Sequence, residues 1–249
     1  MKERLDKIIK ARRLIRSRSR AQRMIEAGRV KVDGHVITRP GHPIDPEAEI
    51  EILSYEQYVS RGGEKLEAAL EQFRIEVKGK ICLDVGASTG GFTDCLLQNG
   101  AAKVYAIDVG HDQLHPNLRR DDRVIAREGI NARYLEPQDV DEPIELVVID
   151  VSFISLKLVL LPLVELLAEK SDIVALVKPQ FEVGRGRVGK GGVVRNPELH
   201  REVLDTLSAF FDGVGWRVLE RVESPIPGPK GNREFLVYLK RLHPVPLPV

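Results

Sequence analysis

The chain has 249 residues and a mass of 27.9 kDa, enough for a small domain followed by a medium one. Apolar residues make up 43% and charged residues 30%, the balance of an ordinary globular protein with a buried core. Two cysteines cannot build a disulfide framework, and no uncharged apolar run reaches the roughly 20 residues of a membrane span. The first residues, Met1 to Asp6, lack the apolar stretch of a signal peptide. Composition therefore argues against a secreted disulfide-rich module or an integral membrane protein, and it predicts a cytoplasmic one.

The net charge of +1 hides a strongly basic N-terminus. Residues 1–40 carry 13 lysines and arginines against 4 acids, whereas residues 41–60 carry 5 acids and no base. The first 60 residues thus have a charge of +4, and the remaining 189 have a charge of −3. A basic head on a nearly neutral body indicates a polyanionic partner that binds at the N-terminus.

Residues 1–53 show the pattern of a small α+β unit. Apolar residues at helical spacing predict two short helices, the second of which ends at Gly28. Alternating apolar residues then predict short strands at 30–32 and 50–53, the first entering an Asp-Gly turn.

From residue 61 onward, after a linker-like stretch at 54–60, strand-like and helix-like segments alternate. Strands separated by helices predict right-handed crossovers and a mostly parallel sheet. The segments are strands at 80–85, 103–108, 146–150 and 172–177, with helices at 91–99, 155–169 and 197–211.

The last two predicted strands, 216–222 and 234–239, have only a Pro/Gly turn between them, which predicts an antiparallel hairpin. The fold class is therefore α/β. We predict a doubly wound, mostly parallel, seven-stranded Rossmann-like sheet over residues 58–249, preceded by a small domain over residues 1–57.

The clearest chemical motif is the glycine-rich turn Gly86-x-x-x-Gly90-Gly91, which leads from an apolar strand into a helix. Asp108 ends the next strand 22 residues after Gly86, where a carboxylate can accept hydrogen bonds from both hydroxyls of a ribose. The spacing differs from the dinucleotide fingerprint, and the turn lacks the Gly-Lys-Ser/Thr of a phosphate loop. Asp84 would repel a pyrophosphate but would suit a cationic ligand. The turn favours S-adenosylmethionine over NAD or ATP; the alternative is a tight turn that binds nothing.

Four charged residues lie where doubly wound sheets bind their ligands. Asp150 and Lys178 each end an apolar strand, Lys65 opens the helix before the first strand of the sheet, and Glu234 begins the last strand. Solvated strand-end charges that pair with one another would show the same pattern. The residues alone leave both interpretations open.

The order of the motifs resembles that of the TlyA family, whose members are called both hemolysins and ribosomal RNA 2′-O-methyltransferases. Residues 1–53 resemble an S4-type RNA-binding domain, above all over Ser17–Gly34, and the remainder resembles an FtsJ-type ribose methyltransferase. The methyltransferase motifs, in order, are Ser60–Leu66, Asp84–Phe92, Asp150–Leu156, Val177–Glu182 and Gly231–Phe235.

The resemblance implies a Lys-Asp-Lys-Glu catalytic tetrad at Lys65, Asp150, Lys178 and Glu234, with Lys178 as the candidate base. It implies S-adenosylmethionine as methyl donor and a ribose in ribosomal RNA, of cytidine, as acceptor. Ser88 has a second interpretation as a helix cap. The predicted cofactor-binding residues are Asp84, Gly86, Ser88, Gly90, Asp108, Val109, Asn131 and Asp150.

RNA contacts are predicted in two basic segments. The alternative is a solvated charged face for the first and a mobile solvated loop for the second. The first segment holds Arg12, Arg13, Arg16, Arg18, Arg20 and Arg23. The second is a glycine-rich loop after Lys178 that would close over RNA and holds Arg185, Arg187 and Lys190. The six histidines show no metal-ligand spacing, so no metal is predicted.

Two other functions compete with the methyltransferase. A membrane-active hemolysin is suggested by the family's other name, but the chain lacks a signal peptide, a membrane span and a long amphipathic helix. A non-catalytic ribosome factor with the same fold would bind RNA without methylating it. The tetrad favours the enzyme.

Overall fold

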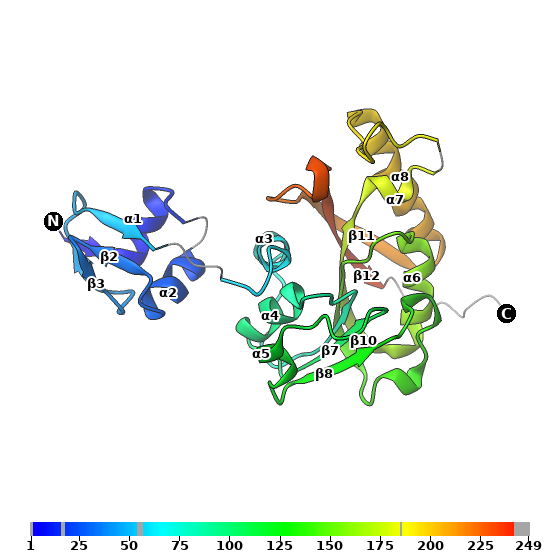
Figure 1. Ribbon diagram of the computed structural model, residues 1–249, viewed down its shortest axis with the longest axis horizontal. Helices are drawn as coiled ribbons and strands as arrows, with labels where there is room; N and C mark the ends of the chain where they lie inside the picture. Colours follow the sequence, from blue (N-terminus) through cyan, green and yellow to red (C-terminus); the bar gives the residue numbers. More distant parts are fainter. Residues whose placement is uncertain (1, 16–17, 54–56, 185, 242–249) are drawn as a thin grey trace. The chain divides into compact units, whose positions relative to one another are not determined.

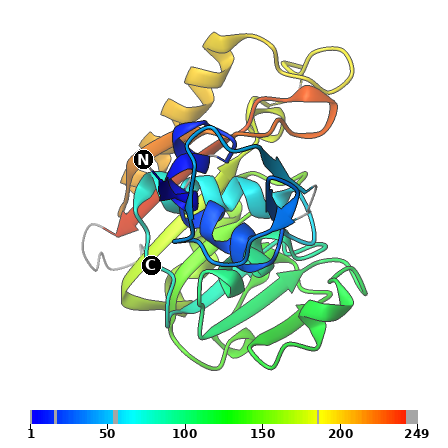
Figure 2. The ribbon, with the colours of Figure 1, turned by 90° about the vertical axis from the view of Figure 1, so that its left-hand side faces the viewer.

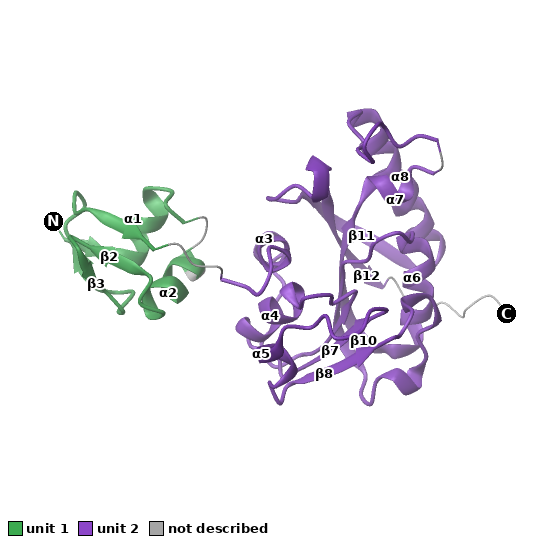
Figure 3. Ribbon diagram, in the orientation of Figure 1, with its two compact units in different colours: residues 1–56 green, residues 57–249 purple. Residues whose placement is uncertain are grey.

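The computed structural model describes residues 2–15, 18–53, 57–184 and 186–241. The chain divides into two compact units, residues 1–56 and 57–249, coloured separately in Figure 3. Arg16, Arg185 and the Pro-rich end of the chain lie outside the described residues.

The first unit is a helix pair packed on short strands. Its core is formed by apolar residues spaced for burial on one helix face, including Leu5, Ile9 and Ile25, together with Val30 of the central strand. Strand β2 pairs antiparallel with both β3 and β5, and β1 pairs with β4. The elements are β1 (Glu3–Arg4), α1 (Leu5–Ala11), α2 (Arg18–Glu26), β2 (Val30–Val32), β3 (His35–Val36), β4 (Pro43–Ile44) and β5 (Ile50–Ile52).

A buried carboxylate organises the arginines of this unit. The Asp6 side chain is fully buried and accepts hydrogen bonds from Arg4 Nε at 3.0 Å, Arg18 Nε at 2.9 Å and Gln22 Nε2 at 2.7 Å. Although burial opposes ionisation, these partners outweigh it and hold the pKa of Asp6 well below its usual range. Asp6 therefore joins α1 to α2 across the core of the unit.

The second unit is a seven-stranded sheet in the order β11-β12-β10-β9-β6-β7-β8. Six of the seven strands run in one direction, and β12 runs opposite to them. The predicted doubly wound sheet with a terminal hairpin is therefore confirmed. The strands are β6 (Ile81–Val85), β7 (Lys103–Asp108), β8 (Val124–Glu128), β9 (Ile144–Ile149), β10 (Leu167–Val177), β11 (Trp216–Glu223) and β12 (Phe235–Arg241).

Helices cover both faces of this sheet, as Figure 1 shows, and Figure 2 places β8 and α8 toward opposite ends of the unit. Alternate residues of each buried strand supply the two cores: Leu83 and Val85 pack on the α6 and α8 side, and Cys82 packs on the α3 and α4 side. The helices are α3 (Gly62–Phe73), α4 (Gly91–Gln98), α5 (Pro116–Arg119), α6 (Leu156–Leu163), α7 (Pro179–Glu182) and α8 (Pro197–Gly213), with 3₁₀ turns η1 (Ala132–Tyr134), η2 (Pro137–Asp139), η3 (Val164–Leu166) and η4 (Pro229–Gly231).

The helix predicted over 155–169 is shorter in the structure. It ends at Leu163, one residue after Pro162, whose ring cannot donate a backbone hydrogen bond. Strand β10 then begins at Leu167, where that residue pairs with Ile144 of β9. No helix in the described part of the chain is long and apolar enough to cross a membrane.

Replacing Asp6 with asparagine removes the charge that draws Arg4 and Arg18 together. We expect the protection of α1 and α2 backbone amides against hydrogen exchange to fall by about 2 kcal/mol, because hydrogen bonds to a charged partner are lost. The measurement is hydrogen exchange of the full chain followed by mass spectrometry, with the exposed Glu26→Gln as the matched control. Unchanged protection in Asp6→Asn would show that the network does not stabilise this unit.

Candidate active site

The register of the sheet brings four predicted residues to one edge. Val85 of β6 pairs with Ile149 of β9, and Val177 of β10 pairs with Phe235 of β12. The next residue along each parallel strand and the residue before β12 therefore project from the same edge. These residues are Gly86, Asp150, Lys178 and Glu234.

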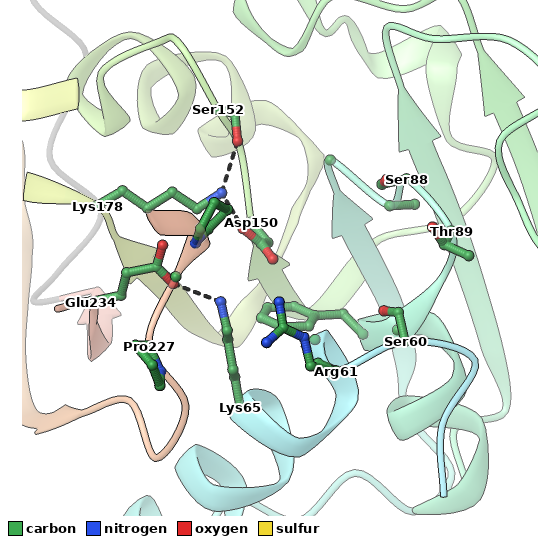
Figure 4. Close-up of a pocket in the computed structure, with 17 residues that line it drawn as sticks. Ser60, Arg61, Lys65, Ser88, Thr89, Asp150, Ser152, Lys178, Pro227 and Glu234 are labelled. Carbon is green, nitrogen blue, oxygen red and sulfur yellow. Dashed lines mark hydrogen bonds and ion pairs between the residues drawn. The ribbon is translucent and has the colours of Figure 1, made fainter. Parts of the chain in front are cut away.

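Two ion pairs form at this edge. Lys178 Nζ lies 2.7 Å from Asp150 Oδ1 and donates a hydrogen bond to Ser152 Oγ at 2.8 Å. Lys65, in the first turn of α3, donates to Glu234 Oε2 at 2.6 Å. Figure 4 shows the ends of these four charged side chains gathered in one part of the cavity, opposite Ser88 and Thr89.

Burial makes these pairs strong and mutually dependent. The side chain of Glu234 is fully buried, and those of Lys65, Lys178 and Asp150 are 10%, 11% and 22% exposed. Two ammonium groups face two carboxylates, so the cluster has no net charge, which offsets the cost of removing each charge from water. Removing one member leaves its partner uncompensated.

A glycine allows Glu234 to sit where it does. A Cβ built on Gly228 would lie 1.9 Å from Glu234 Oε1, which no hydrogen bond or solvent reaches. The Pro227-Gly228-Pro229 loop thus packs its backbone directly against the carboxylate and restrains it.

Three adjoining cavities meet at the tetrad. The central cavity, about 510 Å³, is lined by the four charged residues and by the glycine-rich turn. The glycine-loop cavity, about 760 Å³, shares Gly86, Ser88 and Asp150 with it and extends past Asp108. The aromatic cavity, about 330 Å³, shares Lys178 and Glu234 with the central one and contains Phe153 and Phe181.

Asp108 and the glycine-rich turn are fixed to each other. The carboxylate accepts hydrogen bonds from Ser88 N at 2.8 Å and Gly110 N at 2.7 Å, one on each oxygen. Gly86 has φ +88°, and a Cβ there would lie 2.5 Å from the Asp150 carbonyl oxygen, so glycine is required. Each Asp108 oxygen retains capacity for one further donor.

Most of the predicted cofactor residues line the glycine-loop cavity: Gly86, Ser88, Asp108, Val109, Asn131 and Asp150. Ser88 is not the cap of α4, because Gly90 occupies that position. Asn131 Oδ1 accepts from Arg133 N and so also caps a 3₁₀ turn.

The structure does not bring Gly90 or Asp84 to these cavities. Gly90, with φ +99°, faces Leu118 and Leu114, where a Cβ would clash. Asp84 is fully buried on the α4 side of β6, and its Oδ2 accepts from the Thr93 hydroxyl at 2.6 Å. Burial raises the pKa of Asp84 to about 7, so the residue is far less suited to a cation than its position in the sequence suggests.

Several residues that line these cavities are not among those predicted from the sequence. Ser152 holds the Lys178 amine, and Phe153 is 90% exposed with φ +64°, a strained conformation for an aromatic residue. Tyr134 and Gln113 line the glycine-loop cavity. The sequence signal available for Phe153 was an aromatic residue three positions after a strand-end acid, in Asp150-Val-Ser-Phe153.

The predicted RNA-binding arginines divide into bonded and exposed side chains. Arg12 donates to the carbonyl oxygens of Ala48, at 2.8 Å, and of Pro46, and Arg18 is held by Asp6. Arg13 is exposed just after α1, whereas Arg20 and Arg23 are partly buried within α2.

The glycine-rich loop after Lys178 is held by side chains outside it, Glu202 and Asn232. Arg187 forms two hydrogen bonds of 2.5 Å to Glu202 of α8, whereas Lys190 is exposed. Among the described residues no group of three or more His, Cys, Asp or Glu side chains is arranged to hold a metal ion.

Comparison with known proteins agrees with this geometry. The FtsJ-like methyltransferase family matches residues 58–241, and the S4 domain family matches residues 3–50. The chain belongs to the FtsJ-like methyltransferase family. Distant solved structures share the fold alone, among them a Listeria monocytogenes protein described as an S-adenosylmethionine-dependent methyltransferase, at 15% identity and a TM-score of 0.55 over 73% of this chain and 99% of that one.

The resemblance to the TlyA family is also confirmed. The 16S/23S rRNA (cytidine-2′-O)-methyltransferase TlyA of Mycobacterium tuberculosis is 45% identical over 95% of this chain and 89% of its own length. Hemolysin A of Brachyspira hyodysenteriae is 44% identical over 94% of this chain and 98% of its own length. A solved structure from Streptococcus thermophilus is 45% identical, with a TM-score of 0.74 over 99% of this chain and 92% of that one.

The raised pKa of Asp84 predicts a pH-dependent stability. The folded protein keeps the Asp84 proton up to about pH 7, whereas the unfolded chain loses it near pH 4, so the free energy of unfolding falls as pH rises between these values. Asp84→Asn carries no such proton. We expect urea unfolding to show Asp84→Asn gaining about 3–4 kcal/mol relative to the wild type between pH 4 and pH 8. If the free energy of unfolding changed with pH in the same way in both proteins, the raised pKa of Asp84 would be refuted.

Gly228→Ala tests the restraint on Glu234. The added methyl group must displace the carboxylate, so we expect methyl transfer to slow by about tenfold to a hundredfold while cofactor affinity stays unchanged. The measurement is single-turnover transfer together with cofactor titration. Gly213→Ala, at a glycine with no neighbouring atom within 4 Å, is the control and should match the wild type. A Gly228→Ala variant at the wild-type rate would contradict this restraint.

Proposed function

We propose that this chain transfers a methyl group from S-adenosylmethionine to the 2′-hydroxyl of a ribose in ribosomal RNA, that of a cytidine, in the cytoplasm. The observation that carries the proposal is the pair of buried lysine–carboxylate contacts between the glycine-loop cavity and the aromatic cavity. Relatives that match nearly the whole chain carry the same activity in their names.

The residues of the glycine-loop cavity fit the proposed cofactor. Asp108 retains one hydrogen-bonding position on each oxygen, which suits the two ribose hydroxyls. Gly86 lets the backbone of Asp150 pack directly against the glycine-rich turn, which keeps Asp150 at the wall of this cavity. Exposed Val109 and Tyr134 offer apolar surface to an adenine ring. S-adenosylmethionine supplies an electrophilic methyl group on a sulfonium.

Lys178 is the residue we propose as base. Its ammonium group must first release a proton to solvent, which leaves an amine with two N–H hydrogens and one lone pair. Ser152 Oγ accepts one hydrogen, and Asp150 Oδ1 lies 2.7 Å from the amine nitrogen, so both restrain the amine and its lone pair can take the proton of an incoming hydroxyl. A base held in this way activates the weak ribose nucleophile without a metal ion.

Lys65 and Glu234 have a positioning role in this proposal. Their contact fixes the ammonium of Lys65 at the central cavity, where it can donate to the attacking oxygen as negative charge develops there. Much of the acceleration comes from holding two substrates in line.

The aromatic cavity is the proposed site of the target nucleoside's base. It borders Lys178 and Glu234, and the rings of Phe153 and Phe181 lie 4.9 Å apart between centroids. An exposed aromatic ring suits a base that has left its stack. Phe153 is thus proposed to stack on that base.

The first unit is proposed to hold structured RNA through its basic surface. Arg18 and Arg4 are fixed side by side by Asp6 and about half-exposed, and Arg13 is a further candidate for phosphate contacts. In the second unit, Lys190 is the exposed candidate. Arg12 contributes chiefly to the fold, because its guanidinium is bonded to carbonyl groups. The hemolysin name of some relatives has no counterpart in the cavities, and we do not propose that activity.

Lys178→Ala tests the proposal. Labelled methyl transfer from S-adenosylmethionine to purified ribosomal subunits, whole ribosomes and protein-free RNA should occur with the wild type. The variant should be about a hundredfold to ten-thousandfold slower, because a general base is lost. Cofactor affinity should be retained.

The exposed Lys170→Ala is the matched control and should transfer label at the wild-type rate. Absence of label on every substrate, or full activity of Lys178→Ala, would contradict the proposal. Cofactor binding without transfer by the wild type would favour a non-catalytic ribosome factor.

A further inference from the structure

The aromatic cavity contains a polar side chain that the proposed chemistry does not use. Gln180 lies in the short helix α7, two residues after Lys178, and lines this cavity. Its amide oxygen has virtually no solvent-accessible surface and no hydrogen-bond donor within reach.

The other neutral polar side chains of the cavity are already bonded. Asn232 accepts from Val194 N and donates to the carbonyl oxygens of Gly192 and Pro229. Ser152 accepts from Lys178. Among the described neutral polar residues lining this cavity, Gln180 alone makes no hydrogen bond.

An unpaired buried amide oxygen is costly, and folded proteins rarely keep one. Gln180 belongs to a rigid neighbourhood, because Glu182 in the same helix accepts hydrogen bonds from the Ser155 hydroxyl at 2.7 Å and from Leu156 N at 2.8 Å. The helix that carries Gln180 is therefore fixed beside the cavity, and the amide oxygen has no partner from the protein. A ligand with complementary groups would supply the missing bonds.

We infer that Gln180 recognises the Watson–Crick edge of the target base, an inference that rests on the function proposed above. A base whose ribose lies against Lys178 occupies the aromatic cavity, which Gln180 lines. Cytosine presents an amino donor beside a ring-nitrogen acceptor. The amide presents an oxygen acceptor beside an N–H donor, and the terminal torsion of glutamine turns easily to align them. Gln180 thus replaces the hydrogen bonds that the base loses on leaving its paired or stacked position.

The test is a double-mutant cycle between Gln180 and the exocyclic amino group of the base. The nucleotide that the wild type methylates is mapped first. Ribosomal RNA is then prepared with either cytidine or pyrimidin-2-one riboside, which lacks the amino group, at that position. The measured quantity is kcat/KM for wild type, Gln180→Leu and Gln180→Glu.

We expect Gln180→Leu to lower kcat/KM on cytidine by about tenfold to a hundredfold. Removal of the amino group from the substrate should lower kcat/KM by tenfold or more for the wild type and by less than twofold for Gln180→Leu. Gln180→Glu retains an acceptor and should stay sensitive to the amino group. Gln138→Leu, on an exposed turn outside the three cavities, is the control and should match the wild type.

Cofactor affinity and thermal unfolding show whether the variants are folded. If Gln180→Leu is not, Gln180→Met, which keeps the length of the side chain but lacks the amide, replaces it with the same expected result. The inference is wrong if the wild type is indifferent to the amino group, or if Gln180→Leu loses as much on its removal as the wild type does. A wild type that methylates no ribosomal RNA would instead overturn the proposed function and this inference together.

Discussion

The site depends on the way two lysines are held against two carboxylates at the edge of the sheet. Asp150 and Lys178 come from neighbouring parallel strands, whereas Glu234 precedes a strand that runs the other way. Because β12 is antiparallel, its beginning lies at the same edge as the ends of β9 and β10. The terminal hairpin, which breaks the otherwise parallel pattern, is thus the feature that completes the tetrad.

Charge balance and low solvent exposure together keep the two lysines and two carboxylates in this one geometry. An isolated buried charge would lower its cost by changing protonation, and a solvated pair would gain little. Here each ammonium has a carboxylate within 2.7 Å, and the surrounding glycines bring backbone against the acids without intervening side chains. The same close packing that leaves no space for a Cβ at Gly228 or Gly86 holds the charged groups of the tetrad in place.

The sequence predicts the sheet well because its buried strands are short apolar runs that end in a polar residue. It cannot supply distances: Lys65 and Glu234 are 169 positions apart, and only the folded sheet places them in contact. Asp84 shows a second limit, because it lies inside β6 with its side chain buried against α4, whereas Gly86 lies just past the end of the strand and lines the cavities. Arg12 and Arg187 show a third, since their partners lie 15 to 36 residues away and a basic segment reveals nothing of them.

The most direct test of the central claim is the chemical position of the transferred methyl group. Ribosomal RNA methylated by the wild type with isotopically labelled S-adenosylmethionine is digested to nucleosides, which are identified by mass spectrometry. An amine fixed by Asp150 and Ser152 at a ribose hydroxyl predicts label in 2′-O-methylcytidine and none on a base. Label on a base carbon or nitrogen would contradict the assignment of the tetrad to hydroxyl activation.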